Sequence, residues 1–403
     1  MRRRTRGLGL GAAVRTFNDL AVPGLGGVWF ARPLAWAVLG IKVARAAGRS
    51  NVAVANAIEA LACWHVRTHR DPRVRGRRKL AGVTGPFVPF RDASRRSFYV
   101  TQPMRQGTVQ PLRALGLVDD AGPQRFNAFE LTEAGERLAQ LAFDGFRPRN
   151  STVESVLSRW VSGSDGVHVA PMGAALDPRA PLPKPARDLI LSRLHTCGAG
   201  AARRQAATRW LENLDSTPSW KKRPAAVDVE HWRDLRAGAR FFEMQRAALA
   251  VLDGAESLVR TAGAFQVGDA VAEPLRSLID ELTARARAFE HEKHVPAGTD
   301  EAATFASEVV RTDRSAVMRS LVERDGRGLD LDGDRVVPGP VFPRQPPSEA
   351  AADDEDEDED VTPQAQGLPL PEGVSVRVRA LHTLNQDLGG RLDSLLEVAE
   401  EAE

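Results

Sequence analysis

The strongest constraint on the fold is the spacing of apolar residues, which recur every three or four positions over much of the chain. A continuous apolar face at this spacing is typical of amphipathic helices. Alanine, leucine and arginine dominate the sequence, and these residues favour helices over sheets. The predicted fold class is therefore mainly α, with helices at about 33–47, 50–69, 186–195, 200–213, 228–262, 270–290 and 301–324.

The domain organisation follows from shifts in composition along the 403 residues, a length at which two or three domains are expected. Glycine and proline gather between residues 163 and 185, where we expect a linker, and GLDLDGDRVVPGPVF (328–342) predicts a small hairpin. The predicted parts are a basic arm (1–20), an N-terminal domain (28–147), the linker (163–185), a helical domain ending in the hairpin (186–342), a disordered acidic and proline-rich segment (343–374) and a C-terminal helix (375–403).

Charge is distributed unevenly, although the formal net charge is only +2. Residues 67–96 contain ten Lys or Arg and two Asp, whereas residues 353–360 read DDEDEDED. Such segregation indicates a basic face for a polyanion and a solvated acidic tail. The acidic run is therefore a candidate competitor for the basic face.

The stretch from Phe98 to Leu141 predicts a helix, a β-hairpin and a second helix. Apolar residues at 109, 112 and 115 share one helical face, and Gly116 ends that helix. The pair at 117–118 begins a strand, a turn rich in Asp, Gly and Pro follows, and residues 126–131 alternate as a half-exposed strand does. Thr132 is then suited to cap the next helix.

This stretch resembles the second half of a winged helix-turn-helix domain of the MarR/ArsR-like group. In that group the recognition helix ends in LxxLGLV followed by an acidic residue, and the wing leads into LTxxGxxL. Here these motifs stand at Leu112–Asp119 and Leu131–Leu138, with Arg125 near the tip of the wing. The resemblance covers residues 98–141 only.

The resemblance implies a duplex-DNA contact. Arg and Gln side chains can make paired hydrogen bonds with base edges in the major groove. On the wing, Arg125 and Asn127 would reach phosphates or the minor groove. The side chains that the resemblance places on the exposed face of the recognition helix are Arg105, Gln106, Thr108, Gln110 and Arg113. The flanking basic segment would supply salt-dependent phosphate contacts through Arg75, Arg77, Arg78, Lys79, Arg95 and Arg96.

Two residues of the candidate recognition helix depart from this pattern. Pro111 removes a helical hydrogen bond and costs about 3 kcal/mol inside a helix, and Gly107 weakens the same turn. We therefore expect a short helix that begins near Pro111.

Sequence patterns typical of catalysis are weak. Cys63, His65 and His69 do not share a helical face, and the carboxylates at 330, 332 and 334 do not complete a calcium loop. We predict no catalytic residue, no metal and no cofactor. Two widely spaced cysteines favour a reducing cytoplasm, and the apolar run at 33–41 is too short to cross a bilayer.

The favoured hypothesis is a non-enzymatic, cytoplasmic DNA-binding adaptor or regulatory subunit of a multi-protein DNA-handling system. The helical domain and the C-terminal helix would contact partner proteins or, in a homodimer, a second copy of the chain. The alternative is a scaffold whose winged helix contacts protein only. A third hypothesis is a metal-dependent nuclease that uses the carboxylates around Asp330–Asp334.

Overall fold

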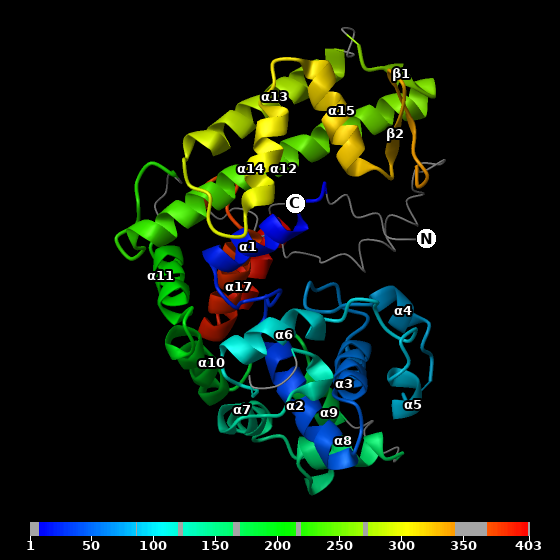
Figure 1. The fold of residues 1–403 in the computed structure, drawn as a ribbon. Coiled ribbons are helices and arrows are strands. Elements are labelled where there is room, and N and C mark those ends of the chain that lie inside the picture. The colour runs from blue at the N-terminus through cyan, green and yellow to red at the C-terminus, as the bar shows by residue number, and fades with distance from the viewer. Residues whose placement is uncertain are drawn as a thin grey trace. The chain divides into compact units, whose positions relative to one another are not determined.

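The computed structural model describes residues 8–85, 87–119, 124–163, 170–214, 219–268, 273–342 and 369–401. These residues are mainly helical, which confirms the predicted fold class (Figure 1). The chain divides into two compact units. Unit 1 contains Met1–Ala21, Asn213–Ser348 and Pro369–Val376, and unit 2 contains Val22–Glu212, Glu349–Leu368 and Arg377–Glu403.

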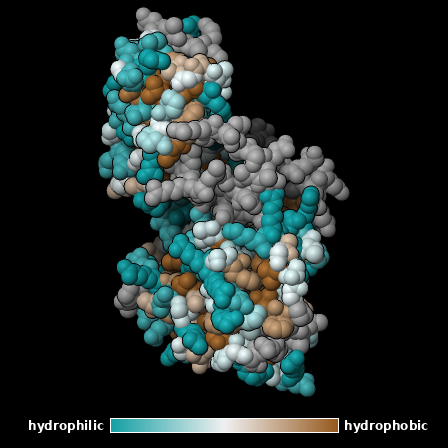
Figure 2. Space-filling model, turned by 90° about the vertical axis from the view of Figure 1, so that its right-hand side faces the viewer, coloured by the Kyte–Doolittle hydropathy of each residue, from teal (hydrophilic) through white to brown (hydrophobic). Residues whose placement is uncertain are grey.

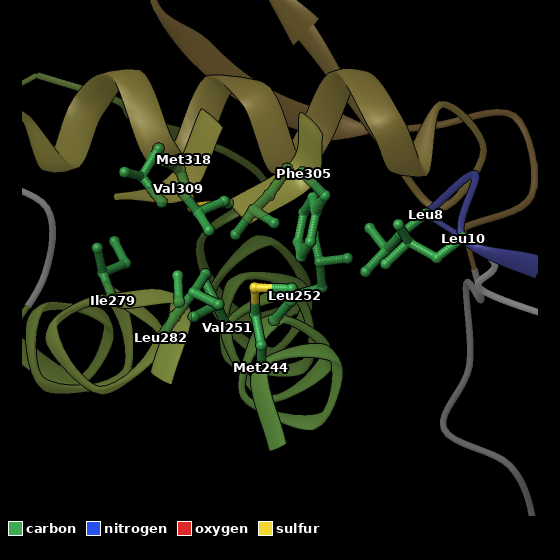
Figure 3. Close-up of a cluster of buried hydrophobic side chains, with 14 of the residues drawn as sticks. Leu8, Leu10, Met244, Val251, Leu252, Ile279, Leu282, Phe305, Val309 and Met318 are labelled. Atoms are coloured by element: carbon green, nitrogen blue, oxygen red, sulfur yellow. The ribbon is translucent and has the colours of Figure 1, made fainter. Parts of the chain in front are cut away.

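Unit 1 is built around one long helix, α12 (Val229–Ala262). Asp228 begins this helix, because its side chain accepts a hydrogen bond from the backbone N–H of His231 at 2.8 Å. The apolar face of α12 packs against neighbouring helices over Met244, Val251 and Leu252 (Figure 3). The other helices of the unit are α1 (Gly11–Ala21), α13 (Glu273–His291), α14 (Asp300–Val309) and α15 (Arg314–Asp325).

A small antiparallel sheet lies beside these helices. β2 (Leu329–Asp332) and β3 (Arg335–Pro338) form the hairpin predicted over 328–342, in a register that pairs Leu331 with Val336. The structure adds a short strand that was not predicted, β1 (Phe265–Gln266), on the other edge of β3.

Both ends of unit 1 differ from the sequence prediction. The basic arm predicted over 1–20 includes α1, whose Phe17 stacks on Phe241 with ring centroids 4.9 Å apart. The disordered segment predicted over 343–374 reaches into described residues at its end, where Trp220 donates to the carbonyl of Glu372 at 2.8 Å. Residues 369–376 therefore belong to the packed unit, while the acidic run at 353–360 lies outside the described residues.

Unit 2 is an array of shorter helices packed on α2 (Ala31–Ala47) and α3 (Asn51–His65). Both are buried on most sides because their sequences are almost entirely apolar. The further elements are α4 (Arg77–Ala81), α5 (Phe90–Ala93), α6 (Arg105–Ala114), η1 (Phe126–Ala128), α7 (Glu133–Phe143), η2 (Pro148–Asn150), α8 (Val153–Val161), α9 (Ala170–Leu176), α10 (Lys184–Thr196), α11 (Ala201–Glu212), α17 (Val376–Gly389) and α18 (Leu392–Glu401).

The C-terminal helix was expected to be a separate element, and this expectation is wrong. The predicted helix is divided into α17 and α18 at Gly390, which has a positive φ of 71°. The leucines of α17 at 381, 384 and 388 are buried, and Asp387 accepts a hydrogen bond from the backbone N–H of Ala31 at 2.7 Å. This helix is part of unit 2 from residue 377 onward.

Two boundaries also differ from the prediction. The chain passes from unit 2 to unit 1 between Glu212 and Asn213, whereas the predicted linker at 163–185 lies within unit 2. Arg32 holds the end of that stretch in place, since its guanidinium donates to the carbonyls of Ala175 and Ala180. The predicted helix 301–324 is two helices, because Asp313 caps a new helix through the N–H of Ser315.

Candidate nucleic-acid interface

The candidate recognition helix corresponds to α6, which contains Pro111 in its interior and does not begin there. Proline has no N–H, so the carbonyl of Gly107 cannot receive its usual helical hydrogen bond. The backbone N–H of Gly27 donates to that carbonyl at 3.3 Å. The predicted start near Pro111 is therefore wrong, and a loop from outside the helix compensates for the proline.

The approach of this loop is possible because glycines face each other. A β-carbon at Gly107 would lie 2.7 Å from the carbonyl oxygen of Gly27, and one at Gly26 would lie 2.8 Å from the ring of Pro111. One side of α6 is thus covered by the loop.

Three of the five side chains expected to be exposed on α6 are engaged within unit 2. Thr108 is fully buried, and its hydroxyl donates to the carbonyl of Arg105 at 2.7 Å, so the expectation of an exposed threonine is wrong. Arg105 donates to Asn56 at 2.6 Å and lies over the ring of Phe126. Gln110 accepts a hydrogen bond from Arg377 at 3.0 Å.

The remaining two side chains differ in exposure. Gln106 is exposed, and its amide donates to the carbonyl of Thr101 at 3.3 Å. Arg113 is half-buried. The described face of α6 therefore offers fewer groups to a DNA groove than its sequence predicts.

The predicted wing is mostly not a hairpin. Among the described residues, antiparallel pairing is confined to the base of the predicted wing, at the bridge between Val118 and Leu131, and η1 (Phe126–Ala128) occupies the place of the second strand. Asn51 on α3 causes this, because its side-chain amide donates to the carbonyls of Phe126 and Phe129, each at 3.0 Å. The tip at 120–123 lies outside the described residues.

The two wing residues therefore have different roles. Arg125 is exposed, as predicted. The side-chain oxygen of Asn127 accepts hydrogen bonds from the hydroxyl of Ser50 and the backbone N–H of Val52, both at 2.9 Å. Asn127 thus stabilises the start of α3, and its prediction as a phosphate contact is not supported by this geometry.

The basic segment between residues 75 and 96 is anchored by apolar residues at several points. Leu80 of α4 and Ala93 of α5 are buried, and Trp160 of α8 donates to the carbonyl of Val88 at 3.0 Å. The ring of Phe90 meets Trp160 edge-on, with centroids 5.4 Å apart. The basic segment therefore contains two short helices that are fixed to the core of unit 2.

Anchoring of this kind leaves the charged side chains on the outside. Arg75 and Arg77 are half-buried, and Arg75 donates to the carbonyl of Gln102 at 2.9 Å. Figure 2 shows the side of the molecule that carries α4 and α5, where hydrophilic side chains lie next to hydrophobic ones. We define the basic surface as the exposed cations of this segment, namely Arg78, Lys79, Arg91, Arg95 and Arg96.

The basic surface has one acidic residue close to it in the sequence. Asp92 is the acidic residue between 77 and 96, and it lies 3.3 Å from Arg95 and 3.7 Å from Arg91. Arg91 remains 83% exposed and Arg95 60% exposed, so solvent screens both pairs strongly. Arg91 and Arg95 therefore stay accessible to phosphates.

A buried carboxylate at the start of α6 was not predicted to have a role. Glu59 on α3 accepts hydrogen bonds from the backbone N–H groups of Met104 at 2.7 Å and Arg105 at 3.0 Å. Burial raises its pKa above the usual range, although these hydrogen bonds oppose the shift. The sequence signal was available, since Glu59 is the one carboxylate in the otherwise apolar helix 51–65.

The surroundings of Cys63 do not support a role for this residue as a catalytic nucleophile. The Tyr99 hydroxyl donates to the Cys63 sulfur at 3.2 Å, and burial raises the pKa of Cys63 to about 12. A thiol of this kind is not ionised near neutral pH.

The carboxylates proposed for a nuclease lie on the hairpin of unit 1. Asp330 and Asp332 are exposed, and Asp334 pairs with Arg319. Within the residues that the structure describes, no three His, Cys, Asp or Glu side chains come together as a metal-ligand group.

Comparisons with known proteins identify no family for the chain, so the functional proposal depends on the geometry of the site. No model of a protein family matches the chain, and neither the curated proteins nor the solved structures gave a match. In the described ranges, no helix combines the length and apolar character needed to span a membrane.

Proposed function

We propose that the protein is a non-enzymatic DNA-binding adaptor or regulatory subunit that holds the phosphate backbone on the basic surface of unit 2. The observation that carries the proposal is the exposure of five cations on α4, on α5 and directly after α5, in a segment anchored by Leu80, Val88 and Ala93. Contacts between cations and phosphates supply most sequence-independent affinity for DNA. Two free cysteines are compatible with a reducing, cytoplasmic setting.

In a standard winged-helix contact, the recognition helix enters a groove of the DNA. In this proposal, the cations of the basic surface contact the DNA instead of α6. Arg105, Thr108 and Gln110 on α6 are occupied by contacts within the unit. The resemblance of residues 98–141 to a winged helix remains a proposal about their fold. Phosphate binding does not require α6 to contact base edges.

Hydrogen–deuterium exchange of the full chain, with and without a duplex DNA, tests where the DNA contacts the protein. We expect slower exchange in peptides covering residues 77–96. Slower exchange confined to unit 1, or no change at saturating DNA and low salt, would contradict the proposal.

The alternative is a scaffold whose winged-helix region, within unit 2, contacts protein only. Such a surface needs a contiguous apolar patch. Among the described residues, the exposed large apolar side chains are separated along the sequence, at Phe87, Val229, Val295, Val341 and Val376. Single exposed residues of this kind are ordinary, so this observation favours the DNA proposal.

A further inference from the structure

Unit 2 contains a pocket at the start of α6 that the phosphate contact does not use. Its walls come from the loop before α2, from the segment that leads into α4, and from residues 102–107. Trp29, Phe30 and Met104 provide apolar surface, and Arg75, Gln102 and Gln106 provide polar groups.

The size of the pocket restricts its ligand. Its volume is about 230 Å³. Pockets for drug-sized ligands typically have volumes of roughly 300–1,000 Å³. A single planar ring system is therefore a better match than a dinucleotide or an extended cofactor.

The polar groups of the pocket favour a ring with a hydrogen-bonding edge. Amide side chains such as Gln102 and Gln106 can donate and accept at one edge of a base, as glutamine does with adenine. The backbone N–H groups of Met104 and Arg105 are already bound by Glu59, so the pocket is not an anion site at a helix terminus.

The pocket is also close to the basic surface along the chain. Arg75 lines the pocket, and Arg78 and Lys79 follow three and four residues later. Consecutive Cα atoms are at most about 3.8 Å apart, so Lys79 begins within about 15 Å of the pocket wall. A nucleotide whose base occupies the pocket would thus have neighbouring phosphates within reach of these cations.

We propose that this pocket binds an unpaired nucleobase of the DNA whose phosphates contact the basic surface. The proposal rests on the proposed function and narrows its substrate class to DNA with a single-stranded end or an extruded base. Removing a base from its stack is least costly where the base is already unpaired.

The test compares two DNA probes with the same number of phosphates. Both contain the same duplex, and one has an overhang of deoxyadenosines while the other has an overhang of abasic sugar–phosphate units. Fluorescence anisotropy with the full chain should show at least about fivefold tighter binding of the deoxyadenosine overhang, the lower end of the effect expected for one stacked base. Equal affinities for the two probes would overturn the base pocket and leave phosphate binding intact, whereas no binding of either probe at low salt would overturn both proposals.

Two substitutions at Gln106 locate the effect, because this side chain is exposed and is not part of the core. Gln106→Trp should fill the pocket and remove the preference for deoxyadenosine over the abasic overhang. Gln106→Ala should weaken the preference without adding bulk. Gln140→Trp on the exposed face of α7 is the matched control and should keep the preference. A preference that persists in both Gln106 variants would contradict the assignment to this pocket.

Discussion

The carboxylate of Asp387 accepts a hydrogen bond from the backbone N–H of Ala31 at 2.7 Å, although 356 positions separate the two residues. The bond satisfies a donor at the first turn of α2, where no helical acceptor is available. Arg187 adds a second contact by donating to the carbonyl of Leu388 at 3.0 Å. The C-terminal helices are therefore a structural component of unit 2.

Asp387→Ala should lower the free energy of unfolding of unit 2. The change leaves the N–H of Ala31 without its acceptor and removes the negative charge beside buried Arg32, whose pKa burial lowers to about 10. We expect a loss of about 2 kcal/mol, as for other buried caps. Urea unfolding of the two proteins measures this difference in the free energy of unfolding. Asp393→Ala is the control, because that carboxylate is 64% exposed in its pair with Arg73 and should cost at most about 0.5 kcal/mol.

Acid should destabilise unit 2 partly through His382. This histidine is buried, its Nδ1 has no hydrogen-bond partner among the described residues, and burial lowers its pKa below 6.5. The unfolded state then binds more protons, so this contribution to stability is complete above pH 6.5 and is lost as the pH falls toward the folded-state pKa. His382→Gln should therefore lose less stability than the unsubstituted protein between pH 7 and pH 5. Parallel pH curves for the two proteins would show that His382 does not contribute.

Asn51 should be more important for stability than any residue of the predicted wing. Its amide donates to two carbonyls of the segment 126–129, and Asn51→Ala would remove both hydrogen bonds in a buried region, leaving the carbonyl of Phe126 with only the 3.3 Å bond from the N–H of Phe129. We expect a cost of about 2 kcal/mol in thermal or urea unfolding. The exposed Arg125→Ala change should cost less than about 0.5 kcal/mol. Equal effects of the two substitutions would contradict the described path of the chain.

For Gly107→Ala, helix propensity and packing predict changes of opposite sign in the free energy of unfolding. Alanine is intrinsically more favourable than glycine inside a helix by about 1 kcal/mol. Because the new β-carbon would lie 2.7 Å from the carbonyl oxygen of Gly27, we expect a net destabilisation of about 1–3 kcal/mol. Gly82→Ala is the control, since its β-carbon would make an ordinary contact of 3.5 Å with the carbonyl of Lys79. Stabilisation by Gly107→Ala would show that the loop at Gly27 does not pack on α6.

The sequence predicted helices well where one apolar face persists over many residues. The predicted helix 228–262 matches α12 within one residue, and Asp228 is a capping residue that a sequence pattern can identify. The hairpin at 328–342 was also predicted, because Asp-Gly lies between two alternating runs.

Predictions failed where a distant partner determines the local structure. The strand predicted at 126–131 is absent because Asn51, about 75 residues earlier, binds its carbonyls. Likewise, α6 continues through Pro111 because Gly27 supplies the missing donor. Local periodicity contains no information about either partner, so neither the helix through Pro111 nor the loss of the strand at 126–128 could be predicted from it.

Salt-dependent binding of duplex DNA is the most direct test of the proposed phosphate contact. Fluorescence anisotropy would compare the full chain with a variant in which Arg78, Lys79, Arg95 and Arg96 are alanine. The control removes four exposed cations of unit 1, Arg233, Arg246, Lys293 and Arg311. We predict that the logarithm of the association constant falls linearly with the logarithm of the salt concentration. In the first variant only, the slope should become shallower by up to about 0.9 for each phosphate that no longer meets a cation. Equal slopes for the intact chain and the basic-surface variant, or an equal change in the control, would contradict the claim that this surface binds DNA.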